Sequence, residues 1–229
     1  MTRFKLAAVL SIGTALSTLS VPAMAEEDQG FTAGSILLRA RAVGIWTETS
    51  NGPINDLGNT TIYGNIQTTS PIIPEIDASY FFTPNIAVEV IAGTARAGLR
   101  AKDTKLGNVD LGNTWILPPT ITLQWHFMPT GFVNPYVGAG LNYTWFYNIQ
   151  GGSEIGGNLK LKPALGEALQ VGADFNLSGR WYANVDVKKI FLTTAAQADT
   201  SNLAAGTQLN VQNIALNPWL VGVGIGYRF

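Results

Sequence analysis

The chain has 229 residues, a formal net charge of −1 and no cysteine, and only 13% of its residues are charged. Because soluble domains carry about 25% charged residues, this composition argues against a cytosolic globular protein. The near-neutral charge excludes the basic surface of a nucleic-acid-binding protein, and 46% hydrophobic residues exclude a disordered chain. Without cysteine the chain forms neither a disulfide nor a thiolate metal site.

The first 25 residues have the pattern of an export signal. Arg3 and Lys5 precede an apolar stretch from Leu6 to about Leu19, and Ala23-Met24-Ala25 follows. This order predicts a secretory signal peptide over residues 1–25, cleaved before Glu26. No later segment reaches the ~18 apolar residues that a transmembrane helix needs. We therefore expect residues 26–229 to form either an exported soluble β-protein or a β-barrel in an outer membrane.

Eight segments of the mature chain alternate apolar and polar residues, which is the period of a β-strand. They lie near residues 35–46, 72–82, 86–95, 120–127, 137–147, 170–175, 181–188 and 219–229. In the last segment Trp219, Val221, Val223 and Ile225 alternate with glycine-rich positions, and aromatic residues stand at both ends of the apolar face. This pattern is typical of a transmembrane β-strand, in which we expect the glycines to relieve crowding inside a small barrel.

The connections between these segments fall into two classes. Those near residues 83–85, 128–134 and 176–180 are short, whereas those near 47–70, 96–116, 149–162 and 193–211 are long and polar. Short turns alternate with long loops at the periplasmic and extracellular ends of outer-membrane barrels. The sequence thus predicts an all-β protein, an eight-stranded antiparallel up-and-down transmembrane β-barrel of a Gram-negative outer membrane. Both termini are expected to be periplasmic, and the long segments solvated connectors.

Four motifs in the same order carry a resemblance over nearly the whole mature chain. They are Leu117-Pro118-Pro119-Thr120 with Gln124-Trp125, Pro135-Tyr136-Val137-Gly138-Ala139-Gly140-Leu141-Asn142-Tyr143, Gln170-Val171-Gly172-Ala173-Asp174, and Asn217-Pro218-Trp219 with the terminal Gly226-Tyr227-Arg228-Phe229. Together they resemble the OmpW family of outer-membrane proteins. The resemblance implies an eight-stranded barrel with a narrow hydrophobic interior that admits small hydrophobic molecules. The terminal Phe is similar to the signal read by the barrel-insertion machinery.

The inward faces of the predicted strands divide into two layers. The periplasmic half carries charged residues, namely Arg39, Arg41, Glu75, Asp77, Glu89, His126, Asp174, Asp186 and Arg228, with Asn184 among them. The outer half is apolar, with Val43, Ile45, Ile73, Ile91, Phe146, Ile190 and Leu220. An unpaired buried charge costs several kcal/mol, so opposite charges are expected to pair. We interpret the layers as a periplasmic plug and a channel-lining vestibule. The alternative for the charged layer is that it only fills the barrel and fixes the strand register. The alternative for the apolar layer is ordinary packing without a ligand.

Two channel-lining positions and five prolines bear on how a solute would pass through the predicted channel. The family resemblance aligns channel-narrowing positions with Ile91 and Lys188, the second of which is aromatic in a relative. The lysine departs from the family pattern, although its aliphatic stem can line an apolar channel. Prolines weaken strand pairing, and Pro71, Pro74, Pro118, Pro119 and Pro218 lie in the outer parts of their segments. The hypothesis is that some frame a lateral opening into the membrane; the alternative is that they only mark strand ends.

The expected function is that of an outer-membrane channel for passive uptake of small hydrophobic molecules. A structural or adhesive barrel with a sealed interior is the alternative, and a soluble lipocalin-like carrier fits poorly because the last strand lacks a polar outer face. Expected partners are outer-membrane lipid, lipopolysaccharide, small hydrophobic solutes and the insertion machinery, with no nucleic acid. Catalysis is not expected, because His126, the one histidine, would lie inside the barrel, far from the outer leaflet. We expect no cofactor and no metal.

Overall fold

The computed structural model describes residues 30–50, 54–55, 61–62, 65–104, 107–152, 159–199 and 208–229. The predicted signal peptide, residues 1–25, lies outside these ranges. All regular secondary structure in the described part of the chain is β-strand. Within the same ranges, no helix has the length and apolar character needed to cross a bilayer.

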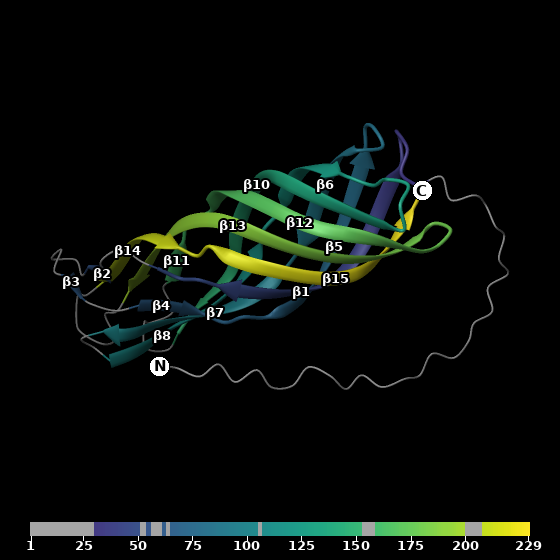
Figure 1. The fold of residues 1–229 in the computed structure, drawn as a ribbon. Coiled ribbons are helices and arrows are strands. Elements are labelled where there is room, and N and C mark those ends of the chain that lie inside the picture. Colours follow the sequence, from purple (N-terminus) through teal and green to yellow (C-terminus); the bar gives the residue numbers. More distant parts are fainter. Residues whose placement is uncertain are drawn as a thin grey trace, which may run out of the picture.

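Eight strands close into a barrel (Figure 1). In order around the ring they are β1 (Ile36–Thr47), β5 (Ile72–Phe81), β6 (Ile86–Gly93), β9 (Thr120–His126), β10 (Val133–Gly151), β12 (Ala164–Ser178), β13 (Trp181–Asp199) and β15 (Pro218–Arg228). Every neighbouring pair is antiparallel. The last strand pairs with the first, from Leu37 opposite Arg228 to Thr47 opposite Pro218, and this pairing closes the ring. The predicted eight-stranded antiparallel barrel is confirmed.

The outer surface of the barrel wall is apolar and the middle of its interior is polar, because successive side chains of a strand point to opposite faces. On β9, Ile121, Leu123 and Trp125 are about half exposed, whereas Thr122 and Gln124 are buried. The same alternation runs along the other seven strands of the ring. A large apolar outer surface suits lipid and would be a liability in water. This arrangement is the inverse of a soluble lipocalin-like carrier.

Glycines of β15 face the two interior arginines of β1. Arg39 lies opposite Gly226, and Arg41 lies opposite Gly224. A Cβ atom at Gly226 would stand 2.7 Å from Cγ of Arg39, and one at Gly224 would stand 2.7 Å from Cγ of Arg41. These contacts are too short for any real side chain. The glycines therefore make room for the arginine side chains to cross the barrel.

The long connections do not form the expected solvated loops, because much of their length continues as sheet. One extension adds β8 (Gly107–Leu117), β7 (Ala95–Thr104) and β4 (Asn65–Thr68) to β10. The other adds β14 (Gln208–Ala215), β2 (Ile54–Asn55), β3 (Thr61–Ile62) and β11 (Leu159–Leu161) to β13. In Figure 1 the two extensions lie apart at the left end of the barrel.

A hydrophobic core explains why these extensions form. On β7, Ala97, Leu99 and Ala101 are buried in alternation with Arg96, Gly98 and Arg100. Leu99 and Ala101 belong to a cluster that also holds Ile66, Val109, Leu111, Leu159 and Ile214. The prediction of solvated connectors was wrong here because small apolar residues alternate with polar ones and resemble loop sequence. We call this end of the barrel the extended end and the other, with its three short hairpins, the short-turn end.

Candidate functional site: the barrel interior

Arg39 anchors a buried charged cluster in the short-turn half of the barrel. Its Nε donates to Asp77 Oδ1 at 2.8 Å, and its Nη1 donates to Asp174 Oδ1 at 3.0 Å. Its Nη2 donates to Glu89 Oε1 at 2.8 Å and to Ser79 Oγ at 2.6 Å. All of these side chains are fully buried. One guanidinium group thus joins strands from opposite sides of the ring, since β1, β5, β6 and β12 all contribute.

Arg41 forms the second centre of the cluster, one inward position further along β1. Its Nη2 lies 2.8 Å from Asp77 Oδ2, and its Nε lies 3.0 Å from Glu75 Oε1. Its Nη1 lies 3.7 Å from Asp186 Oδ2. Glu75 and Asp77 thus both contact arginines of β1, as charge pairing in the sequence predicted.

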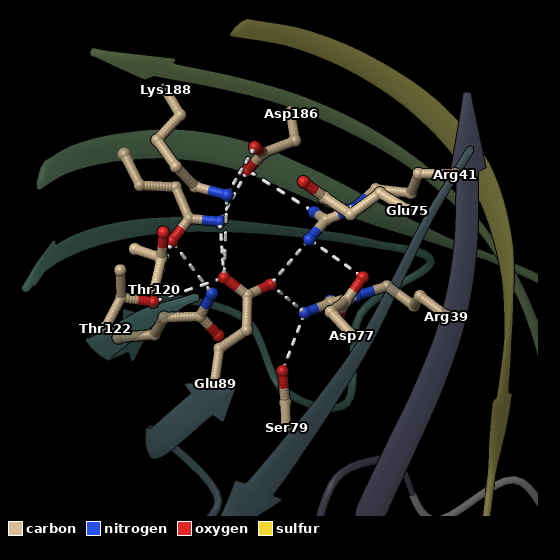
Figure 2. Close-up of polar contacts among 12 residues, drawn as sticks. Arg39, Arg41, Glu75, Asp77, Ser79, Glu89, Thr120, Thr122, Asp186 and Lys188 are labelled. Atoms are coloured by element: carbon tan, nitrogen blue, oxygen red, sulfur yellow. Dashed lines mark hydrogen bonds and ion pairs between the residues drawn. The ribbon is translucent and has the colours of Figure 1, made fainter. Parts of the chain in front are cut away.

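Glu89 lies at the middle of the cluster (Figure 2). One of its carboxylate oxygens accepts hydrogen bonds from both Arg39 and Arg41. The other accepts from Gln170 Nε2 at 2.9 Å and lies 3.9 Å from Lys188 Nζ. Glu89 therefore connects three cationic side chains, and its removal would leave each of them with one partner fewer.

Lys188, expected among the channel-lining residues, lies in the charged cluster instead. Its ammonium group is buried, 3.5 Å from Asp186 Oδ1 and 3.9 Å from Glu89 Oε2. The reason is electrostatic. The cluster contains five carboxylates, from Glu75, Asp77, Glu89, Asp174 and Asp186, so two arginines alone would leave a larger excess of negative charge.

Neutral polar residues complete the cluster, and of those named here sequence reasoning singled out only Asn184. Tyr136 Oη donates to Asp186 at 2.9 Å, and Gln170 Nε2 donates to the same oxygen at 2.7 Å. Asn184 Nδ2 donates to Asp174 at 2.8 Å. Their alternation with outward apolar residues was the available signal. It indicates the face on which they lie, but their partners belong to distant strands.

The two remaining residues of the expected plug lie nearer the short-turn end. His126 is buried, with Nδ1 2.8 Å from Asn134 Nδ2 and Nε2 3.2 Å from Gln124 Oε1. Both ring nitrogens therefore have neutral side-chain partners. Arg228 is partly exposed at the end of β15, opposite Leu37 of β1.

An aromatic layer, which the sequence analysis missed, lies beneath the charged cluster. Phe31 stacks on Phe81 with ring centroids 4.4 Å apart and on Tyr182 at 4.9 Å, and His126 packs 4.8 Å from Phe81. The Phe31 amide donates to the carbonyl of Pro129 at 2.9 Å, which fixes the chain across the short-turn end. Phe31 precedes the first strand, so periodicity could not place it. Its buried ring closes the barrel at this end.

We expect Phe31→Leu to lower the free energy of unfolding by about 1–2 kcal/mol, because leucine keeps much of the apolar volume but loses two stacked ring pairs. Urea titration of the barrel in lipid vesicles would measure the change. Phe132→Leu is the matched control, because Phe132 is 70% exposed in a short turn. Equal effects of the two substitutions would show that the aromatic layer adds no specific stability.

An apolar cavity of about 80 Å³ lies on the other side of the charged cluster, toward the extended end. Four of the expected channel-lining residues border it, namely Ile45, Phe146, Ile190 and Leu220. Val43 and Ile73 belong to the same hydrophobic cluster as the cavity wall without lining the cavity. Ile91 is buried on β6, opposite Asp77 and Thr120, and does not border the cavity either.

Polar residues in the cavity wall are largely satisfied by one another. Asn142 Nδ2 donates to the carbonyl of Pro118 at 3.1 Å and to Thr120 Oγ1 at 2.9 Å. Thr144 Oγ1 donates to Asn142 Oδ1 at 2.7 Å. These bonds occupy polar atoms of Asn142 and Thr144, whereas the buried Thr68 hydroxyl has no hydrogen-bond partner among the described residues.

Three of the five prolines, Pro71, Pro118 and Pro218, also line the cavity. Pro119 lies just before β9, where its carbonyl accepts a hydrogen bond from the Tyr143 amide at 3.0 Å. Pro74 faces outward within the β1–β5 ladder, opposite Ala42. Strand pairing is thus continuous at Pro74.

The sequence model of the OmpW family matches residues 32–229. The chain belongs to the OmpW family. It is 40% identical over 227 residues to an uncharacterized outer-membrane protein of Sinorhizobium fredii, covering 97% of this chain and 93% of that protein. It is 32% identical over 203 residues to outer membrane protein W of Escherichia coli, covering 86% and 89%. The crystal structure of the outer membrane protein OprG from Pseudomonas aeruginosa is similar with a TM-score of 0.79 and 25% identity, covering 88% of this chain and 98% of that one.

This OmpW-family protein is an outer-membrane β-barrel of Gram-negative bacteria, as the sequence resemblance implied. Its outward aromatic residues mark the membrane span. Trp125 lies near the short-turn end opposite Val137, and Trp145 follows eight residues later on the same strand as Val137. At about 3.4 Å per residue and a strand tilt of about 40°, the two indoles are about 20 Å apart along the membrane normal, close to the height of the apolar band in such barrels.

The cavity lies at the level of the aromatic belt nearer the extended end. Trp46 and Trp219 are paired in register on the outer surface, while their neighbours Ile45 and Leu220 line the cavity inside. A solute in the cavity would therefore be separated from the lipid of one leaflet by the thickness of the wall.

The wall beside the cavity contains a break in strand pairing. The β1–β5 ladder ends at Gly44 opposite Ile72, followed by one hydrogen bond from the Ile45 amide to the Pro71 carbonyl at 3.0 Å. Beyond that point β4 pairs with β7, and within the described ranges no pairing joins β4 to β1. We call this break the β1–β4 seam. Thr47, Thr68, Thr69 and Pro71 border it and line the cavity.

Proposed function

We propose that this OmpW-family barrel is a passive conduit through which small hydrophobic molecules enter the outer membrane. The observation that carries the proposal is the apolar cavity. It lies at the level of an aromatic belt, and the buried charged cluster bounds it on the side of the short turns. Solutes would enter the cavity from the extended end, which we assign to the cell exterior. The short turns and both termini would then be periplasmic, the usual arrangement in such barrels.

The charged cluster acts in this proposal as a plug. An apolar solute gains nothing from contact with the Lys188 ammonium or the Asp186 carboxylate, and separating these groups to let it pass would leave buried charges unpaired. The aromatic layer around Phe31 forms a second barrier below. Direct passage into the periplasm is therefore unfavourable, and the same enclosure keeps His126 from any outer-leaflet substrate, so we propose no catalysis.

The β1–β4 seam is the proposed lateral exit. Separating most neighbouring strands of the ring would break a ladder of backbone hydrogen bonds. At the seam, a single bond from Ile45 to Pro71 precedes the unpaired region. Ile72 beside it is 78% exposed, which gives the outer margin of the seam an apolar surface for lipid or solute. Pro71 is thus the proline that would frame the proposed opening, whereas Pro218 pairs with Thr47 on the other side of β1.

The size of the cavity requires the seam to open during passage. A cavity of about 150 Å³ accommodates benzene in an engineered protein interior, whereas this one measures about 80 Å³. The described conformation is therefore closed to most solutes. The same smallness favours the second candidate function, a structural or adhesive barrel whose interior stays sealed.

Uptake of an apolar fluorescent probe by cells or vesicles containing the barrel tests the two candidates. We expect Phe146→Asp to reduce uptake at least about tenfold, because a carboxylate in the cavity raises the barrier for an apolar solute by more than about 1.4 kcal/mol. Phe146→Leu should retain uptake. Phe132→Asp makes the same chemical change at an exposed turn and should also retain it. Uptake that is unaffected by Phe146→Asp would favour the sealed barrel.

A further inference from the structure

The outer surface of the extension formed by β4, β7 and β8 carries a polar groove with an unusual charge. The groove measures about 350 Å³, and Gln67, Arg100, Lys102, Asp110 and Asn113 are among the residues that line it. Arg100 and Lys102 point outward because Leu99 and Ala101 fill the core on the other face of β7. Within the described ranges, neither cation takes part in an ion pair.

On the β13 side, the described residues form no groove with two such cations. Lys189, an outward lysine of β13, lies 2.7 Å from Glu48 Oε2 and 4.7 Å from the ring centroid of Trp219. A second groove of similar size, about 310 Å³, lies beside β13 and contains Lys162 as its one charged residue. Of these two grooves in the described part of the chain, only the groove of β4, β7 and β8 therefore places two cations without an ion-pair partner on one wall.

The position of this groove relative to the membrane identifies the kind of ligand. Arg96 lies opposite Trp115, which packs 6.3 Å from Tyr147 in the aromatic belt. Arg100 follows four residues later, about 13 Å further along the strand, in the layer that headgroups occupy beyond the hydrocarbon. Arg96 itself donates to Asn113 Oδ1 at 3.2 and 3.0 Å, which leaves Arg100 and Lys102 as the available cations.

We propose that this groove binds the phosphate groups of lipopolysaccharide, with the lipid A acyl chains lying on the apolar wall below. Two cations beside neutral donors from Gln67 and Asn113 suit a phosphate. Asp110 is the one acidic residue of the groove, and its Oδ1 accepts a hydrogen bond from the Gly112 amide at 2.9 Å. Below the groove, Val90 and Ile121 are about half exposed and offer the acyl chains an apolar surface.

A bound lipid would lie next to the β1–β4 seam. Thr68 and Thr69 border both the groove on the outside and the cavity on the inside. The proposed phosphate site lies on the outer surface of the barrel. Lipid binding there therefore does not depend on solute transport through the interior.

Native mass spectrometry of the intact barrel in micelles doped with bis-phosphorylated lipid A would test the site. We expect Arg100→Gln with Lys102→Gln to weaken lipid A binding about 30-fold, since each cation near a lipid surface contributes about 1 kcal/mol and tenfold corresponds to about 1.4 kcal/mol. Lys162→Gln, in the other groove, should leave binding unchanged. Heat-modifiable migration on a gel would verify that each variant is folded.

Two further measurements on the unmodified protein separate the sources of phosphate. Dephosphorylated lipid A should bind the unmodified protein about as weakly as phosphorylated lipid A binds the double variant. Excess inorganic phosphate should leave lipid A bound, because a free anion lacks the acyl contacts. Equal binding of the two lipids, or unchanged binding by the double variant, would overturn the proposal. Displacement of lipid A by inorganic phosphate would assign the groove to free anions instead.

Discussion

Replacement of Arg39 by Met is expected to lower the free energy of unfolding by about 3–5 kcal/mol, because it removes one partner from a buried ionic cluster. Methionine has an apolar side chain of roughly similar length, so little cavity forms. The loss would come from Asp77, Glu89 and Asp174, which now share Arg39 at 2.8–3.0 Å and have no access to water. Urea titration in lipid vesicles, followed by tryptophan fluorescence, would measure it.

Two variants control this experiment. Lys189→Met breaks the ion pair with Glu48, whose side chain is 68% exposed, and should cost no more than about 1 kcal/mol. Adding Asp174→Asn to Arg39→Met should recover part of the loss, because one uncompensated carboxylate is then gone. An Arg39→Met variant as stable as the parent would mean that the cluster is solvated or that Arg41 replaces its neighbour.

A disulfide across the base of the β1–β4 seam should reduce uptake of an apolar probe at least about tenfold, a barrier increase of about 1.4 kcal/mol. Ile45 and Pro71 lie one position beyond the last paired residues and share a backbone hydrogen bond of 3.0 Å. Opposed residues of antiparallel strands have Cα atoms about 4.5–5.5 Å apart, within the range that a disulfide spans. The chain has no cysteine of its own, so Ile45→Cys with Pro71→Cys forms only the intended bond.

The readout of this variant is reversible. Oxidation should lower uptake by this factor and reduction should restore it, which separates closure of the seam from any lasting damage to the cavity wall. Ala40→Cys with Ile76→Cys is the matched control, because these residues are register partners within the continuous β1–β5 ladder. Its oxidation should leave uptake unchanged. Undiminished uptake by the oxidised Ile45/Pro71 variant would exclude the seam as the exit.

The layered interior supports the proposal that an apolar solute leaves the barrel sideways. From the short-turn end inward, the barrel contains the aromatic layer around Phe31, the charged cluster around Glu89, and the apolar cavity bordered by Leu220. The first two layers are joined by side-chain contacts across the whole ring. The β1–β4 seam is a weak boundary of the third layer, and it lies at the level of the lipid.

The sequence determined the faces of the strands. Alternation along residues 219–229 and 120–127 was enough to place Val223 and Leu123 outside and Gln124 inside, because the pleat of a strand is a local property with a period of two. Charge chemistry then indicated that Arg39 and Arg41 would meet Glu75 and Asp77. The glycines opposite these arginines were also predictable as relief of crowding in a narrow barrel.

Only the tertiary structure decided which interior residues act together. Closure of the ring sets the register among strands, and this register brought Lys188 to Glu89 and Asp186 instead of to the cavity. It also placed Pro71, Pro118 and Pro218 around the cavity while leaving Pro74 in a ladder. Phe31 and the strands of the extended end escaped prediction for the same reason. Their burial depends on surfaces from distant segments, which a local pattern of residues does not contain.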